Sequence, residues 1–506
     1  MKPNILFLQV DQLWAQSLSA YGNQIVQTPN LDRLAGRGAV FETAYCNFPL
    51  CAPSRFSMAT GQLCSTIGAY DNAAEMGAEY PTYAHYLRHL GYQTALSGKM
   101  HFIGPDQYHG FETRLTADLY PADFSWVPNW ADEGERDTND PQSVLVSGIC
   151  ERSVQIDFDE EVTHQAKRHL WNIVRSSDDR PFFLQVSFTH PHEPYLCRRE
   201  WWDLYDEAGI PLPQVPAMRE NQHDAHSVRI LRDFGMLDYA FKDEDILRAR
   251  RAHYGAISYI DAMIGEILDV LAATGADRNT MIVFTSDHGE FLGERGMWFK
   301  KHFFEPSLRI PLIIAGPGIA AQSVPTMASL VDLLPTFCGM ATGEVWGTDI
   351  EDLAGADLTA FLGQQTTDRT IRAEYLAEAA LAPIYMVRRG PYKYIASSAD
   401  PAMLFNIDTD PDELTNLAAD LAHAETVAAF QADVDTHWDD AALTQDILLS
   451  QRRRALIHQA HQNGTPPRWN HGERPGEQTA WYRGEQGYSD WAFDYLPEGV
   501  RPEALS

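Results

Sequence analysis

Four continuous apolar runs along the chain predict strands that are buried on both faces, as in parallel sheets. These runs cover residues 5–10, 181–188, 281–284 and 310–315. Between the second and third runs, residues 248–273 show helical spacing of large apolar side chains, at Ile257, Ile260, Ile264, Ile267, Leu268 and Leu271. Strands that alternate with helices predict an α/β fold: a large, mostly parallel sheet sandwiched by helices.

The pattern changes at about residue 370. Short alternating runs at 384–387 and 392–396 predict strands, and residues 420–449 have a helix-like pattern. Beyond Gln451 the chain is polar, with many Trp, Tyr, Gly and Pro residues. We therefore predict a large domain over residues 1–370, a small C-terminal α+β domain over 371–450, and a tail over 451–506. The tail has little core of its own, so it packs on the body of the protein or on a neighbouring subunit.

Charge and composition narrow the class of partner. The 506 residues contain 39 Lys and Arg against 70 Asp and Glu, a net charge of −31. A field of this sign repels phosphate backbones and anionic lipids, so neither nucleic acid nor a membrane is an expected partner. Six cysteines are too few for a disulfide framework. The first apolar run is too short for a signal peptide, and no later run is long enough to span a membrane. These features predict a soluble, cytoplasmic protein with reduced thiols.

Acidic residues stand at the ends of two predicted strands. Asp11 and Gln12 follow the run 5–10, and Asp287 and His288 follow the run 281–284. In open parallel sheets ligands bind beyond the carboxyl ends of the strands, so these groups can converge on a metal ion. Alternatively, each aspartate forms a turn or caps a helix, as is common at strand ends.

A short helix is predicted over residues 49–61, which read PLCAPSRFSMATG. Pro53 lies just inside its start and Gly61 terminates it. Cys51 then lies at the helix N-terminus, where free N–H groups favour an anion. Arg55, one turn further on, can offer its guanidinium to a tetrahedral oxyanion. The alternative is an inert cysteine at a helix start.

Further basic groups follow other predicted strands or lie in loops. Lys99 and His101 are two residues apart and face the same side of an extended segment. Two histidines follow the run 181–188, and a lysine lies in a loop rich in Trp and Phe; these are His190, His192 and Lys300. Taken singly, each of these groups is more often a surface or capping residue than a functional one, and the joint pattern is what favours function.

Taken together, these motifs resemble the type I sulfatases of the alkaline phosphatase superfamily. Residues 51–55 match the C-x-P-S-R signature, and the stretches NILFLQVDQ, GKMHF, THPHEPY and SDHGEFLGERGMWFKKHFFE occur in that family's order. The resemblance covers about residues 1–450. It is closest to choline sulfatases, through GKMHFIGPDQYHGFE and YPADFSW. It implies an alkaline phosphatase-like fold and a sulfuric ester hydrolase.

The resemblance also implies a modified residue and a metal ion. The residue that matches Cys51 is oxidised to formylglycine by a maturation enzyme, and its hydrate is the nucleophile. A divalent metal, usually Ca²⁺, would be held by Asp11, Asp287, His288 and residue 51, with Gln12 beside them. The imidazole softens this site, so Mn²⁺ is an alternative.

Roles for the basic residues follow from the same resemblance. Arg55, Lys99 and Lys300 match positive groups around the nucleophile and the sulfate. His101 matches the base that assists breakdown of the sulfated residue. His192 or Lys300 would protonate the leaving oxygen, with His190 as a second candidate that contacts the substrate.

The leaving group stays open. A box for a quaternary ammonium group would draw on aromatic and polar residues, namely Asn72, Trp126, Trp130, Glu374 and Glu378. However, residues 137–144 and the tail depart from the choline sulfatases, so an aryl sulfate is an equal alternative. A phosphonate monoester hydrolase or phosphodiesterase would use the same residues, and a binding protein with an unoxidised Cys51 is a third hypothesis. The Trp-rich tail favours a homo-oligomer over a self-packed monomer.

Overall fold

The computed structural model describes residues 2–131, 140–206, 209–237, 239–364, 368–467, 469 and 492–499. Its centre is an eight-stranded sheet. In spatial order the strands are β12 (Gln322–Val324), β2 (Ala39–Phe41), β11 (Leu312–Ala315), β9 (Thr280–Ser286), β1 (Asn4–Val10), β7 (Phe182–Ser187), β4 (Gln93–Gly98) and β5 (Thr113–Arg114). Only β11 runs antiparallel to its neighbours. The predicted large and mostly parallel sheet is therefore confirmed.

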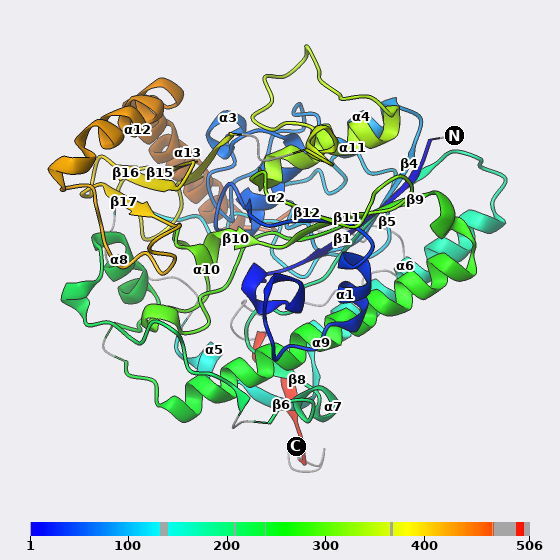
Figure 1. The fold of residues 1–506 in the computed structure, drawn as a ribbon, viewed down its shortest axis with the longest axis horizontal. Coiled ribbons are helices and arrows are strands. Elements are labelled where there is room, and N and C mark those ends of the chain that lie inside the picture. Colours follow the sequence, from blue (N-terminus) through cyan, green and yellow to red (C-terminus); the bar gives the residue numbers. More distant parts are fainter. Residues whose placement is uncertain are drawn as a thin grey trace.

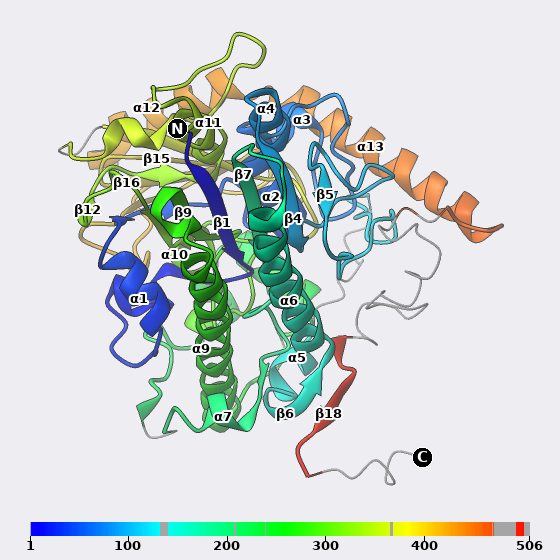
Figure 2. The same cartoon turned by 90° about the vertical axis from the view of Figure 1, so that its right-hand side faces the viewer.

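Helices cover both faces of this sheet, as expected from strands that are apolar throughout. The long helices α6 (Val154–Arg175) and α9 (Asp243–Ala273) lie side by side along one face. The other face is covered by α2 (Cys51–Thr60), α4 (Tyr83–His89) and α11 (Leu333–Thr342) (Figures 1 and 2). Helix α9 starts at Asp243, earlier than its apolar pattern predicts, because its first turn is acidic and suits the positive end of the helix dipole.

One predicted strand is wrong in its extent. The run 310–315 is split at Pro311, which has no N–H to donate to a ladder. Before it, β10 (Arg309–Ile310) pairs antiparallel with β3 (Ala44–Tyr45) in a small separate sheet, which β13 (Ala328–Ser329) completes. After it, β11 joins the central sheet.

The C-terminal part forms an antiparallel sheet with helices beside it, at the left of Figure 1. The strands, in order, are β14 (Thr370–Tyr375), β15 (Ile384–Arg389), β16 (Tyr392–Ser397) and β17 (Met403–Asn406). The helical pattern at 420–449 corresponds to two helices, α12 (Ala424–His437) and α13 (Asp440–Gln462). Helix α13 continues beyond residue 450, so the limit predicted there falls within a helix. Its Arg454 forms a buried, bidentate ion pair with Asp71, at 2.7 Å for each nitrogen.

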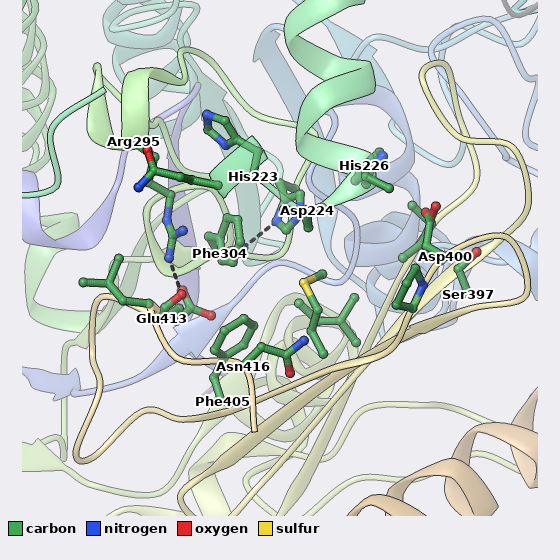
Figure 3. Close-up of a pocket in the computed structure, with 18 of the residues that line it drawn as sticks. His223, Asp224, His226, Arg295, Phe304, Ser397, Asp400, Phe405, Glu413 and Asn416 are labelled. Carbon is green, nitrogen blue, oxygen red and sulfur yellow. Dashed lines mark hydrogen bonds and ion pairs between the residues drawn. The ribbon is translucent and has the colours of Figure 1, made fainter. Parts of the chain in front are cut away.

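A cavity of about 360 Å³ separates the C-terminal sheet from α8 (Ala225–Asp233) and the loop before α10 (Glu305–Leu308). Arg295 lies over the ring of Phe304 here, 3.9 Å from its centroid (Figure 3). Glu413 and Phe405 also line this cavity: Arg295 donates to the carbonyl oxygen of Glu413, and the ring of Phe405 lies 5.9 Å from that of Phe304. The loop that carries Lys300 is joined to the C-terminal sheet by Lys393 of β16, which donates to the carbonyl oxygen of Phe303 at 2.8 Å.

The described part of the tail packs on its own chain. Strand β18 (Tyr495–Pro497) pairs with β6 (Gly148–Ser153), which in turn pairs with β8 (Leu196–Cys197). The other tail residues that led to the prediction of subunit packing, Trp481 and Trp491, lie outside the described residues. All six cysteines are free and buried. Within the described ranges, no helix combines the length and apolar character needed to cross a membrane.

Candidate active site

The site lies where β1 and β9 end. These strands are parallel neighbours with Val10 opposite Ser286, so the residues that follow them, Asp11 and Asp287, emerge side by side. With His288 and Cys51 they form a buried group whose candidate ligand atoms all lie within 4.8 Å of one another. The predicted convergence at the carboxyl edge of the sheet is therefore present.

Cys51 is the first residue of α2, as predicted. Leu50 before it is extended, and Gly61 ends the helix with a left-handed φ of 68°. The next N–H, of Ala52, donates to Oδ1 of Asn72 at 3.0 Å. Burial raises the pKa of the Cys51 thiol, but Lys300, Lys99 and His288 outweigh burial and hold that pKa well below its usual range.

The donor set fits a divalent cation. Oδ1 of Asp11 is buried and has no hydrogen-bond partner among the described residues. Nδ1 of His288 donates to the carbonyl oxygen of Gly289 at 3.0 Å, so Nε2 faces the group and lies 3.3 Å from Sγ of Cys51. Burial alone would raise the pKa of Asp11, but Lys99 and Arg55 lower it to about 2, so the carboxylate is charged. Two carboxylates and an imidazole suit Ca²⁺ or Mn²⁺.

Gln12 is placed differently from its predicted metal role. Its backbone φ is 63°, and its side chain bonds to Glu193, Glu290 and Lys300 rather than to the metal group. Nε2 of Gln12 donates to Glu193 at 2.5 Å and to Glu290, while Oε1 accepts from Nζ of Lys300 at 2.5 Å. Gln12 approaches the metal group through its backbone N–H, which donates to Oδ1 of Asp287 at 3.1 Å.

The spacing of Arg55 from Cys51 predicts that its guanidinium is offered to an oxyanion. In the structure the guanidinium bonds to other groups. Its Nε and Nη2 donate to Asp287 and Asp11 at 2.8 and 2.9 Å. Its Nη1 donates to the carbonyl oxygen of Lys99 and to Oγ of Ser187, each at 2.8 Å. Because the side chain is fully buried among these groups, Arg55 orients the two carboxylates.

Lys99 and His101 both reach the site, although the chain leaves β4 at Gly98. Nζ of Lys99 pairs with Asp11 and lies 3.6 Å above the ring of Tyr120. His101, with a left-handed φ of 57°, lies against the rings of Tyr120 and Trp126. Burial lowers the pKa of His101, and the neighbouring Cys51 opposes that shift. The ring is therefore neutral at pH 7 and can accept a proton.

Lys300 and His192 form a hydrogen-bonded pair, and the charge of Lys300 acts on Cys51. Nζ of Lys300 lies 2.8 Å from Nε2 of His192, and Nδ1 of His192 donates to the carbonyl oxygen of Glu193, also at 2.8 Å. Burial would lower the pKa of Lys300, but the charges of Cys51, Glu193 and Asp11 raise it above its ordinary value. Lys300 is a cation in this site.

His190 is directed away from the metal group. Its Nδ1 lies 2.7 Å from Oδ2 of Asp159 on α6, and its ring packs against Tyr259 on α9. The structure therefore does not bring His190 to the place where it was expected to contact a substrate.

The residues expected around a leaving group are only partly gathered. Trp126 lies beside His101, but Trp130 donates to the backbone of Ala377 at 2.8 Å. Glu374 is buried and accepts from Ser65 and Trp438, so it is committed to the fold. Glu378 pairs with Lys301, at 2.9 Å between Oε1 and Nζ.

Lys301 was missed in the sequence, where it reads only as the neighbour of Lys300. It is buried, has a φ of 85°, and directs its ammonium group to Glu378 and Asp233. Glu193 and Glu290 were missed too. Glu193 follows His192 directly, and Glu290 is two residues after His288.

Comparison with known proteins agrees with these motifs. A family model described as "Sulfatase" matches residues 3–343, and one described as "N-sulphoglucosamine sulphohydrolase, C-terminal" matches residues 293–439. A choline-sulfatase of Rhizobium meliloti (strain 1021) is 43% identical over 483 residues, 93% of each chain. An arylsulfatase of Clostridium perfringens is 28% identical and covers 82% of this chain and 90% of its own.

Solved structures share the fold. The phosphonate monoester hydrolase of Agrobacterium radiobacter superposes with a TM-score of 0.69 at 24% identity, covering 86% of this chain and 95% of its own. A putative sulfatase of Bacteroides thetaiotaomicron gives a TM-score of 0.67 at 22% identity, covering 94% and 100%. At these identities the likeness establishes the fold alone.

Proposed function

Because the chain belongs to the sulfatase family, we propose that it hydrolyses an organic sulfate monoester with an oxidised residue 51, formylglycine, as nucleophile. The buried group of Asp11, Cys51, Asp287 and His288 carries this proposal. It places residue 51 at a helix N-terminus, next to two carboxylates and within the field of two lysines. Such a site suits transfer of a monoanionic group to an oxygen of residue 51.

Asp11, Asp287, His288 and residue 51 would hold a divalent metal, Ca²⁺ or Mn²⁺. When bound, the metal lowers the pKa of its oxygen ligand and offsets the charge of the transferring group. Arg55 fixes the two carboxylates for this purpose.

The surrounding residues bind the sulfate and move protons. Lys99 and Lys300 supply the positive charge for the sulfate oxygens. His101, neutral and adjacent to residue 51, accepts a proton from that residue. The Lys300–His192 pair delivers a proton to the leaving oxygen as the S–O bond breaks.

The leaving group is proposed to be an aryl or a choline-like alcohol. Similarity to the Rhizobium choline-sulfatase favours a choline-like group. The ion pair of Glu378 with Lys301 favours an uncharged one, since the carboxylate already has a cationic partner.

The mass of the tryptic peptide 38–55 tests the nucleophile, with Cys46 in the same peptide as the unmodified reference. We expect one cysteine, at position 51, to be replaced by the aldehyde, and turnover of 4-nitrophenyl, phenyl and choline sulfates by the same preparation. Cys51→Ala should abolish turnover. A fully thiol-bearing protein from cells that contain the maturation enzyme, or an undiminished Cys51→Ala rate, would overturn the proposal.

A phosphonate monoester is a second candidate substrate, because it carries the same single negative charge and the Lys99 and Lys300 charges accept either group. Paired measurements of kcat/KM on 4-nitrophenyl sulfate and a 4-nitrophenyl phosphonate decide between the two. A preference for the phosphonate would replace the sulfatase assignment.

A further inference from the structure

Helix α6 contacts the loop that carries His192 through two buried polar side chains. Near its N-terminus, Gln155 and Asp159 are four residues apart and therefore lie on the same face. Both side chains are buried, and both are directed at the backbone of residues 189–193. This loop follows β7 and leads to His192, the partner of Lys300.

Asp159 holds the first half of the loop. Its Oδ1 accepts from the N–H of Thr189 at 2.8 Å. Its Oδ2 accepts from the N–H of His190 at 3.0 Å and lies 2.7 Å from Nδ1 of the same residue. The carbonyl oxygen of His190 in turn accepts from the N–H of Asp11 at 3.4 Å. These hydrogen bonds fix the loop next to Asp11, the residue of the metal group that follows β1.

Gln155 holds the second half, at a carbonyl oxygen that also accepts from His192, whose Nδ1 lies 3.2 Å from Oε2 of Glu193 as well. Its Nε2 donates to the carbonyl oxygen of Glu193 at 2.8 Å and to that of His192 at 3.2 Å. The same Glu193 oxygen accepts from Nδ1 of His192 at 2.8 Å. An imidazole that donates through Nδ1 keeps the lone pair of its neutral form on Nε2, which here faces Lys300.

We propose that Gln155 and Asp159 are positioning residues that fix the tautomer of His192 and hold its Nε2 opposite Lys300 and the leaving oxygen. The inference rests on the proposed function, because it concerns the pair that donates the proton in that reaction. In the step concerned the S–O bond breaks, the leaving oxygen keeps the electron pair, and one proton passes to it from the Lys300–His192 pair.

This role is tested by the dependence of the rate on the leaving group. Phenol is a weaker acid than 4-nitrophenol, so phenyl sulfate depends more on proton donation. Gln155→Met and Asp159→Asn should lower kcat for phenyl sulfate by about tenfold or more, a fraction of what general acids contribute, and lower it much less for 4-nitrophenyl sulfate. KM should change little, because Lys99 and Lys300 still bind the sulfate.

Two comparisons separate positioning from a general loss of structure. Gln165→Met is the matched control: this glutamine also lies on α6 and donates to Glu161 at 2.7 Å, far from the loop, so its removal should leave both rates unchanged. The double variant Gln155→Met/His192→Gln should be no slower than His192→Gln alone, since residues that act as a unit are not additive.

A direct readout comes from ¹⁵N NMR of histidine-labelled enzyme, with His192→Gln identifying the signal. Protonated Nδ1 is expected in the wild type at a pH where the ring is neutral, and a mixture of tautomers in Gln155→Met. The inference would be overturned by an equal loss of kcat for both esters, by additive losses in the double variant, or by an unchanged His192 tautomer in Gln155→Met. Failure of the proposed function looks different: the wild type, carrying the aldehyde, would then turn over neither ester.

Discussion

Replacing Arg55 by methionine removes a cation that joins Asp11 and Asp287. Its Nε and Nη2 bond these carboxylates at 2.8 and 2.9 Å, and all three side chains are fully buried. Removing one partner of a buried ion pair costs about 3–5 kcal/mol, because the remaining charge loses its compensation. We therefore expect the free energy of unfolding of metal-free Arg55→Met to be lower than that of the metal-free wild type by about that amount.

Metal binding should weaken as well. Side chains that orient metal ligands typically contribute about 10–100-fold in affinity, which corresponds to ~1.4–2.8 kcal/mol. The two quantities can be measured by urea unfolding in EDTA and by calorimetric titration of Ca²⁺ into the metal-free enzyme. Bound metal should stabilise the wild type by more than it stabilises Arg55→Met, because the metal binds the wild type more tightly.

The chain offers a matched control in Arg152. It also joins two carboxylates, those of Asp157 and Glu160, but its side chain is 46% exposed. Exposed pairs contribute about 1 kcal/mol or less, so Arg152→Met should leave both measurements close to wild type. The reasoning is refuted if Arg55→Met binds Ca²⁺ as tightly as the wild type and its metal-free stability falls by no more than that of Arg152→Met.

Three further outcomes are expected. Lys301→Met should raise the ratio of kcat/KM for choline sulfate over phenyl sulfate by about tenfold, or ~1.4 kcal/mol, because Glu378 loses its cationic partner; an unchanged ratio in paired assays would count against this. Asp11→Asn should abolish Ca²⁺ binding in the same calorimetric titration while leaving the circular dichroism spectrum intact. Acid should weaken the fold, since burial lowers the pKa of both His226 and His253 to about 3. The two neutral histidines contribute fully to the free energy of unfolding above pH 6.5, and this contribution is lost as pH falls towards 3, at ~1.4 kcal/mol per pH unit for each. The free energy of unfolding in urea should therefore be lower at pH 5 than at pH 7, and equal values would contradict this prediction.

The sequence predicts the scaffold of the site well, for a physical reason. Strands buried on both faces must be apolar throughout, so β1, β7 and β9 are visible as runs, and the groups at their ends fall at one edge. The position of Cys51 at the start of α2 follows in the same way from Pro53 and Gly61.

The finer assignments needed the structure. Arg55 is spaced to reach over Cys51, but the spacing does not reveal that two buried carboxylates compete for its guanidinium. Gln12 and His190 are adjacent to functional residues in the sequence, yet a left-handed φ at the first and Asp159 beside the second send their side chains elsewhere. Lys301 was hidden because its partner, Glu378, is distant in the sequence.

The burial of Cys51 limits the period in which another enzyme can reach this residue. Its side chain is 1% exposed, and Arg454 of α13, which follows Asp71 by 383 residues, holds that aspartate beside the Asn72 that accepts from the N–H of Ala52. If residue 51 is oxidised as proposed, the enzyme that oxidises it has to act while the chain is still open, because the finished fold buries this side chain. Under that proposal, a molecule that folds before it is oxidised keeps its thiol, and the active share of the protein is decided during biosynthesis.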